Sequence, residues 1–94
     1  MDIIFIEYKV FPDKRDAYMS WIKTAADGDA RFELYEGSDQ PGLFVEQWRG
    51  YDEDGYRSFK TRRLGMGDPA WSGLAEFVPG GLAKVHIWHF RRTI

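Results

Sequence analysis

Apolar and polar residues alternate along four short segments of this chain, as is typical of β-strands with one face turned toward a core. In the first segment Ile4 and Ile6 fall on one side and Glu7 falls on the other. In the last segment His86 and Trp88 share a side, with an apolar residue between them on the other side. The four predicted strands cover Ile3–Val10, Arg31–Glu36, Leu43–Arg49 and Lys84–Arg91.

Two amphipathic helices are predicted between these strands, because apolar residues recur three and four positions apart. The first helix is expected to be capped by Asp13 and to end at 27–29. The second follows Asp52, is interrupted at 65–67 and restarts at Asp68 before it stops. The positions expected on the inner face are Ala17, Tyr18, Trp21, Ile22 and Ala25 in the first helix, and Tyr56, Phe59, Arg63 or Leu64, Trp71, Leu74, Ala75 and Val78 in the second.

The predicted elements follow the order β-α-β-β-α-β. Right-handed crossovers place both helices on one side of a four-stranded antiparallel sheet, which gives an α+β sandwich of the ferredoxin-like kind. The length of 94 residues leaves no room for a second domain, so residues 1–94 are expected to form one.

The sheet is expected to have one apolar face and one face of mixed chemistry. The residues expected beneath the helices are Ile4, Ile6, Phe32, Leu34, Leu43, Val45, Val85 and Ile87. The residues expected on the opposite face are Phe5, Glu7, Arg31, Glu33, Tyr35, Phe44, Glu46, Trp48, His86, Trp88 and Phe90. An aromatic patch of this size is usually covered. We therefore expect a second copy of the sheet to cover it, forming a homodimeric, closed α/β barrel.

Two interpretations fit this mixed face. In the first, Arg31 pairs with Glu33 or Glu46 and the aromatic residues fill the dimer interface. In the second, the same residues line a pocket for a small molecule, and His86 and Glu46 transfer protons. The ligand-binding residues are then expected to be Glu7, Arg31, Glu33, Tyr35, Trp48 and Trp88. His86 and His89 point to opposite faces of a strand, so no metal site is expected.

Composition excludes several other classes of function. A net charge of −2 gives no general attraction to nucleic acid, and the absence of cysteine excludes disulfides and thiolate chemistry. Asp2 and Glu7 lie where a secretion signal would be basic and then apolar, and no stretch approaches the roughly 20 apolar residues of a membrane helix. We therefore expect a cytoplasmic protein.

The strand 43–48 and the helix after it, with Tyr56 and Phe59, resemble the antibiotic biosynthesis monooxygenase-like family of dimeric α/β barrels. The most specific part is Glu46 and Trp48, which are similar to a Tyr-Glu-x-Trp signature of that family. The resemblance implies a monooxygenase-like enzyme that acts on a small aromatic molecule without metal or flavin. A dihydroxyaromatic substrate would supply its own electrons once deprotonated by His86 or Glu46.

The chain also departs from this family. Many members carry a histidine in the second helix, but residues 56–71 contain none, and the asparagine used by the haem-degrading branch is absent from the whole chain. No haem or other cofactor is therefore expected. Members of one fold differ widely in function, so a non-catalytic protein that binds a small molecule or only dimerises is the alternative. RNA-recognition domains share the topology, but Glu7, Glu33 and Glu46 would repel phosphates.

Overall fold

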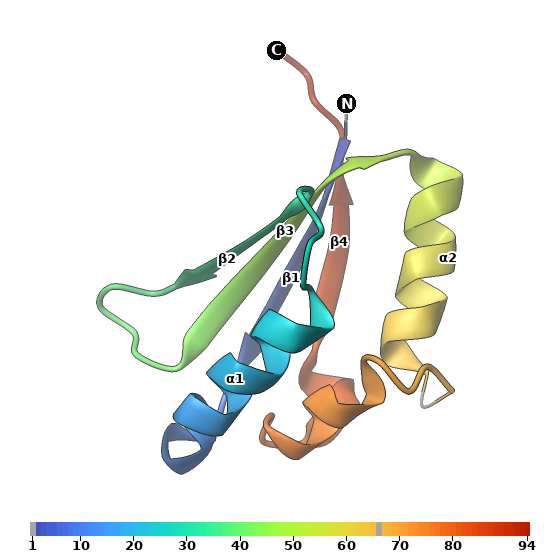
Figure 1. The fold of residues 1–94 in the computed structure, drawn as a ribbon. Helices are drawn as coiled ribbons and strands as arrows, with labels where there is room; N and C mark the ends of the chain where they lie inside the picture. Colours follow the sequence, from blue (N-terminus) through green and yellow to red (C-terminus); the bar gives the residue numbers. More distant parts are fainter. Residues whose placement is uncertain (1, 66) are drawn as a thin grey trace.

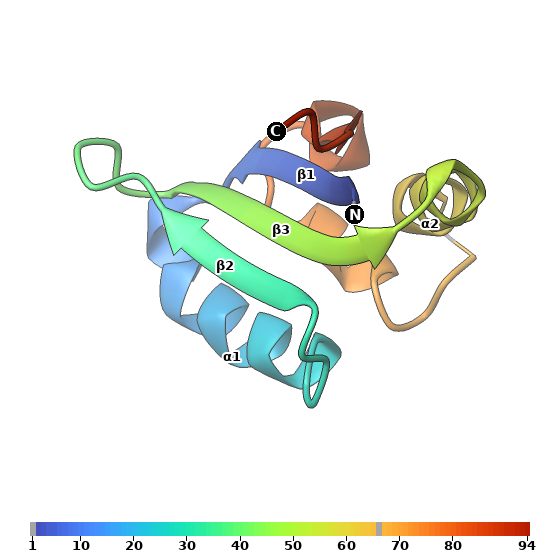
Figure 2. The same cartoon turned by 90° about the horizontal axis from the view of Figure 1, so that it is seen from above.

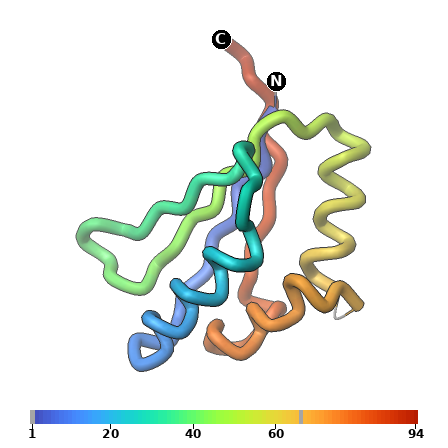
Figure 3. Tube along the Cα trace, viewed as in Figure 1, coloured from blue at the N-terminus to red at the C-terminus, as the bar shows by residue number. Residues whose placement is uncertain are grey.

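The computed structural model describes residues 2–65 and 67–94, which form a four-stranded sheet and two α-helices (Figures 1 and 3). The strands are β1 (Asp2–Lys9), β2 (Phe32–Glu36), β3 (Leu43–Tyr51) and β4 (His86–Phe90). The helices are α1 (Arg15–Ala25) and α2 (Glu53–Leu64). Within the same residues, the short 3-10 helices are η1 (Pro12–Lys14), η2 (Ser72–Glu76) and η3 (Gly81–Lys84).

The strands lie in the order β2-β3-β1-β4, and each neighbouring pair is antiparallel. The chain passes from β1 to β2 through η1 and α1, and from β3 to β4 through α2, η2 and η3. Figure 2 shows α1 lying along one side of the β2–β3 hairpin. This arrangement confirms the predicted α+β, ferredoxin-like fold.

The two helix starts differ in how well local sequence predicts them. α2 begins as predicted, because an Asp52 carboxylate oxygen accepts a hydrogen bond from the Gly55 amide at 2.6 Å and satisfies a donor of the first turn. α1 begins only at Arg15, after η1, and no side chain caps it. The prediction that Asp13 caps this helix is wrong, because Pro12 starts a separate 3-10 turn there.

The segment after α2 is less regular than predicted. α2 ends at Leu64, just before the predicted interruption, in which Met66 lies outside the described residues. No α-helix restarts at Asp68; its side chain accepts a hydrogen bond from the Ala70 amide in a turn, and η2 follows. Gly80 and Gly81, with φ of 86° and 68°, then form a left-handed turn that residues with a side chain rarely adopt.

The register of β3 reverses the faces predicted for its residues. The cross-strand pairs are Ile4 with Trp48, Ile6 with Glu46 and Tyr8 with Phe44. Since cross-strand partners share a face, Phe44, Glu46 and Trp48 lie in the core, and their predicted place on the opposite face is wrong. Leu43 and Val45, predicted to lie beneath the helices, occupy the opposite face instead. The Phe44 and Trp48 rings fill the core, and Glu46 has buried partners there.

None of the helices in the described part of the chain is both long and apolar enough to span a membrane. The cytoplasmic location stays a prediction.

Candidate functional site

The core contains a buried ion pair between Glu46 of β3 and Arg63 of α2. The two terminal nitrogens of Arg63 donate to the two carboxylate oxygens of Glu46, each at 2.8 Å. Glu46 is 0% exposed and Arg63 is 2% exposed. Two parallel, charge-assisted hydrogen bonds are a strong form of this interaction. They connect the last turn of α2 to the middle of the sheet.

Three aromatic side chains complete the hydrogen bonding around Glu46. The Tyr8 hydroxyl donates to one carboxylate oxygen at 2.6 Å, and Trp48 Nε1 donates to the other at 2.9 Å. The Tyr18 hydroxyl lies 2.6 Å from that of Tyr8. Because the Tyr8 hydrogen points to Glu46, we infer that Tyr18 donates to Tyr8. The Glu46 carboxylate thus accepts four hydrogen bonds, which offset the cost of burying its charge.

The charge states within this network follow from its partners. Burial alone would raise the pKa of Glu46, but the Arg63 charge and the donated hydrogen bonds hold that pKa below its ordinary value. Burial would lower the pKa of Arg63, yet Glu46 keeps it above its ordinary value. The pKa of Tyr8 is raised, first by burial and then by the charge of Glu46. Glu46 therefore stays ionised and is a weak base.

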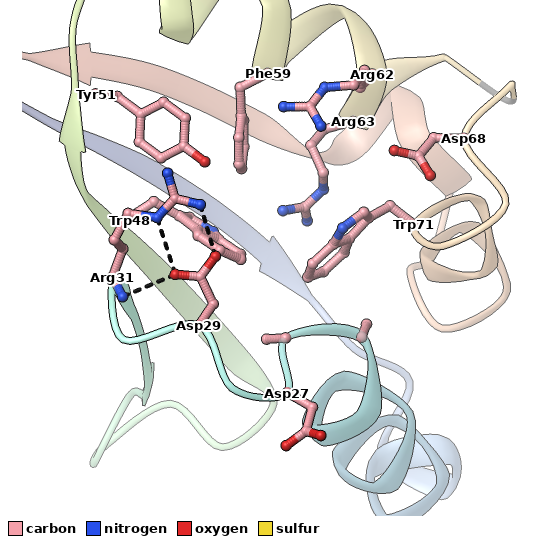
Figure 4. A pocket seen from close by; sticks show the side chains of 12 residues that line it. Asp27, Asp29, Arg31, Trp48, Tyr51, Phe59, Arg62, Arg63, Asp68 and Trp71 are labelled. Atoms are coloured by element: carbon pink, nitrogen blue, oxygen red, sulfur yellow. Dashed lines mark hydrogen bonds and ion pairs between the residues drawn. The ribbon is translucent and has the colours of Figure 1, made fainter.

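A cavity of about 180 Å³ lies beside this network, between the C-terminal end of α1, β3 and α2 (Figure 4). Its walls include the rings of Trp48, Tyr51, Phe59 and Trp71. Phe59 lies 5.4 Å from Trp48 and 5.3 Å from Tyr51 between ring centres, so these walls are continuous. The charged residues at the cavity are Asp27, Asp29, Arg31, Arg62, Arg63 and Asp68. The lining thus combines aromatic rings with many charged side chains, which suits a small ligand that carries both a ring and polar groups.

Arg31 was predicted to lie on the open face of the sheet, which is the face turned away from the helices. It lies at the cavity instead. It precedes β2 and forms two side-chain hydrogen bonds to Asp29, at 3.0 and 2.8 Å (Figure 4). Its guanidinium also lies 4.8 Å from the centre of the Tyr51 ring. The Arg31 hydrogen bonds lower the pKa of Asp29. The predicted pairing of Arg31 with Glu33 or Glu46 is wrong: Arg31 pairs with Asp29, whereas Glu33 pairs with Arg49 and Glu46 pairs with Arg63.

The other predicted site residues lie on the open face of the sheet. Glu7 of β1 is the cross-strand partner of His86 of β4, and the His86 ring stacks on Trp88 with 5.8 Å between ring centres. On β2, the Tyr35 hydroxyl donates to Glu33 at 3.2 Å. The open face thus keeps Glu7, Glu33, Tyr35, His86 and Trp88.

The structure therefore divides the predicted site into two. Glu46 and Trp48 lie with Arg31 on the helix side, whereas His86 and the remaining residues lie on the open side. The expectation that His86 and Glu46 lie on one face and line one pocket is wrong, because the register places them on opposite faces of the sheet. Their individual roles in proton transfer stay predictions.

Sequence reasoning did not identify Tyr8, Tyr18, Arg63 and Trp71 as parts of a site. One signal was present: Arg63 shares the apolar face of α2 with Phe59. A charged residue on an apolar helix face needs a buried partner of opposite charge. Pairing it with Glu46 required knowledge of the β3 register. Within the described residues, no group of three or more histidine and acidic side chains could hold a metal ion.

Neither protein-family models nor curated protein sequences give a match to this chain. Solved structures do match it over its full length. One is an antibiotic biosynthesis monooxygenase, with a TM-score of 0.69 and 10% identity over 100% of both chains. A candidate antibiotic biosynthesis monooxygenase of Nitrosomonas europaea has a TM-score of 0.68 and 16% identity over 100% of both chains. A similar candidate from Deinococcus radiodurans has a TM-score of 0.67 and 13% identity over 100% of this chain and 94% of its own.

These likenesses confirm the predicted resemblance at the level of the fold. The chain has the α+β fold of antibiotic biosynthesis monooxygenase-like structures. At such low sequence identity, these solved structures show that the chain shares their fold and nothing more.

Replacing Glu46 by glutamine is expected to destabilise the protein strongly. The change leaves the Arg63 charge buried without its counter-charge, which costs about 3–5 kcal/mol. Urea unfolding followed by circular dichroism measures the loss. Glu33→Gln is the matched control, because Glu33 forms a part-exposed pair with Arg49 at 3.6 Å, worth under about 1 kcal/mol. Equal effects of the two changes would contradict a central role for the buried pair.

Acid is expected to destabilise the wild-type protein more than Glu46→Gln. The folded-state pKa of Glu46 is lowered, so its contribution is fully present above the ordinary carboxyl pKa of about 4.3 and is lost as pH falls through the folded value. Urea unfolding between about pH 6 and about pH 3 measures, for both proteins, the slope of the free energy of unfolding against pH. Parallel slopes for the two proteins would show that Glu46 protonation does not drive acid unfolding.

Proposed function

We propose that the protein is a monooxygenase-like enzyme that acts on a small aromatic molecule bound in the cavity beside Glu46 and Arg63. The observation that carries this proposal is the aromatic-walled cavity between helices and sheet, in a fold shared with antibiotic biosynthesis monooxygenases. Its volume of about 180 Å³ is of the size that accepts a molecule such as benzene in an engineered protein cavity, about 150 Å³.

In this proposal the protein supplies shape and exclusion of water. A dihydroxyaromatic substrate that has lost a phenol proton to water donates its electrons to molecular oxygen; one oxygen atom joins the ring, which becomes a hydroxyquinone, and the other leaves as water. The rings of Trp48, Phe59 and Trp71 hold the substrate ring. The Glu46–Arg63 pair keeps the inner end of the cavity rigid, because both side chains are buried and fully charged. Trp48 and Phe59, each 4% exposed, are buried walls of the cavity and keep water from that side of the substrate ring, which limits side reactions.

The alternative is a non-catalytic protein that binds a small molecule or only dimerises. One observation favours it: Glu46, which bonds to the cavity residues Arg63 and Trp48, is fully engaged by four hydrogen bonds and is a weak base. His86, the other predicted base, lies on the far face of the sheet. Under this alternative, ligands bind in the cavity without turnover.

We also propose that two copies pair through the open faces of their sheets. Trp88 and Phe90 are 42% and 49% exposed, and both contact Phe5 with 5.7 Å between ring centres. An exposed aromatic cluster on a sheet is a typical protein-interaction surface. The resemblance to dimeric α/β barrels supports a twofold pairing of this face.

Replacing Ala26 by leucine is expected to weaken both binding and oxygen uptake with dihydroxyaromatic substrates by at least about tenfold, or about 1.4 kcal/mol. Ala26 is 8% exposed and lines the cavity, so the larger side chain occupies the space of the ligand. Tryptophan fluorescence measures binding and an oxygen electrode measures turnover. Ala17→Leu, at an exposed position of α1, is the control and should change neither. Binding without oxygen uptake would favour the non-catalytic alternative, and unaltered binding by Ala26→Leu would exclude this cavity as the site.

Replacing Trp88 by glutamate is expected to convert a dimer into monomers. The change adds a charge to each copy of the proposed interface and removes a large apolar contact. Sedimentation velocity measures the assembly, and Leu64→Glu, on an exposed position of α2, is the control. A monomeric wild-type protein, or a Trp88→Glu variant that still dimerises, would refute pairing through this face.

A further inference from the structure

Three of the four tryptophans form a continuous chain through the molecule. The ring centres of Trp48 and Trp71 lie 5.7 Å apart, and those of Trp71 and Trp21 lie 5.6 Å apart. The three tryptophans come from separate parts of the sequence: Trp48 from β3, Trp71 from the turn before η2, and Trp21 from α1. The fourth tryptophan, Trp88, lies on the open face of the sheet.

The two ends of this tryptophan chain have different surroundings. Trp48 is 4% exposed and, with Trp71, forms part of the cavity wall. Trp21 is only partly buried and lies outside the residues that line the cavity. The tryptophan chain therefore begins at the cavity and ends at the surface of α1.

Electrostatics favour a positive charge on Trp48 over one on Trp71, in the middle of the chain. Trp48 donates its Nε1 hydrogen to the Glu46 carboxylate, whose negative charge stabilises a positive charge on the indole. The Arg63 guanidinium lies 3.9 Å from the centre of the Trp71 ring, and its charge disfavours a positive charge there. Positive charge on Trp71 would thus be short-lived and would pass to a neighbour.

We propose that Trp48, Trp71 and Trp21 form a relay that moves a one-electron oxidation from the cavity to the protein surface. An oxygen-centred radical in the cavity takes one electron from Trp48 and becomes an oxyanion. Trp71 then reduces Trp48, and Trp21 reduces Trp71. The Trp21 radical cation releases its indole N–H proton to water, and a thiol in solution restores the indole by giving one electron and one proton, which leaves a thiyl radical. The relay rests on the proposed function in one respect only: reaction with oxygen in the cavity would be the source of such radicals.

The tyrosines next to Trp21 do not extend this relay. Tyr18 lies 6.3 Å from Trp21 between ring centres, and its hydroxyl bonds to Tyr8. Oxidation of a phenol requires that its proton be accepted nearby, and the acceptor at the end of this pair is Glu46. Arg63 holds Glu46 ionised, with a pKa below its ordinary value despite burial. Proton uptake by Glu46 is therefore unfavourable, and the oxidation ends at Trp21.

The test uses azide radicals, a small one-electron oxidant that prefers indoles, generated at a dose of at most one radical per protein. Peptide mass spectrometry then measures oxidised product at each tryptophan. In Trp21→Phe, the product on Trp48 and Trp71 is expected at least to double, because the end of the relay is gone. No contact joins the Trp21 and Trp48 rings, so this change leaves the surroundings of Trp48 intact. Trp88→Phe, at an exposed tryptophan outside the relay, is the control for the loss of one competing target, and it is expected to raise the product on Trp48 and Trp71 less than Trp21→Phe does.

A second variant interrupts the relay in its middle. Trp71→Leu is expected to lower the product on Trp21 and raise that on Trp48, and circular dichroism confirms that each variant is folded. The amount of oxidised Trp48 is compared between the wild type and each folded variant, Trp21→Phe or Trp71→Leu. Equal amounts would overturn the relay. The oxidant is added from outside, so this test does not depend on turnover of an aromatic substrate. The relay and the proposed function can therefore fail separately.

Discussion

The buried ion pair of Glu46 and Arg63 is the constraint on which the rest of this structure depends. A lone charge in a protein core costs several kcal/mol, and breaking a buried pair leaves such a charge behind. Here Arg63, Tyr8 and Trp48 together satisfy both oxygens of Glu46. A one-residue slip of β3 would turn Glu46 outward and leave Arg63 unpaired. The pair therefore stabilises one strand register and one position of α2.

The cavity depends on the same pair. Arg63 holds the last turn of α2 over β3, so the Phe59 ring of α2 meets Trp48 of β3 and forms the cavity wall. Its guanidinium also lies over Trp71, which closes the other side. One interaction thus organises the hydrogen bonds, the aromatic walls and the tryptophan chain. The proposed dimer contact uses the opposite face of the sheet, so pairing of two copies leaves the cavity accessible.

Much of the fold follows from local signals in the sequence. Alternating residues in β1 and β4 placed Ile6 and Ile87 in the core, where the structure has them. The Asp52 cap and the position of α2 also follow from neighbouring residues, because a cap bonds within its own first turn. β3 was different, because its run from Leu43 to Trp48 is apolar on both faces apart from Glu46 and Gln47. The alternation therefore did not distinguish the two faces of this strand, and the face chosen for Leu43 and Val45 was the wrong one.

The sequence by itself determined the element order, the class of fold and the residue types available for a site. The tertiary structure decided which of those residues meet. Glu46 and Arg63 are separated by 17 positions and lie in different elements, so their attraction acts only once β3 and α2 are packed together. That long-range pairing made a buried glutamate favourable, moved Trp48 to the cavity and left His86 on the other face. Local patterns indicate which face of a segment is buried and which is exposed to water. The partner of a buried charge depends instead on which elements pack together in the tertiary structure.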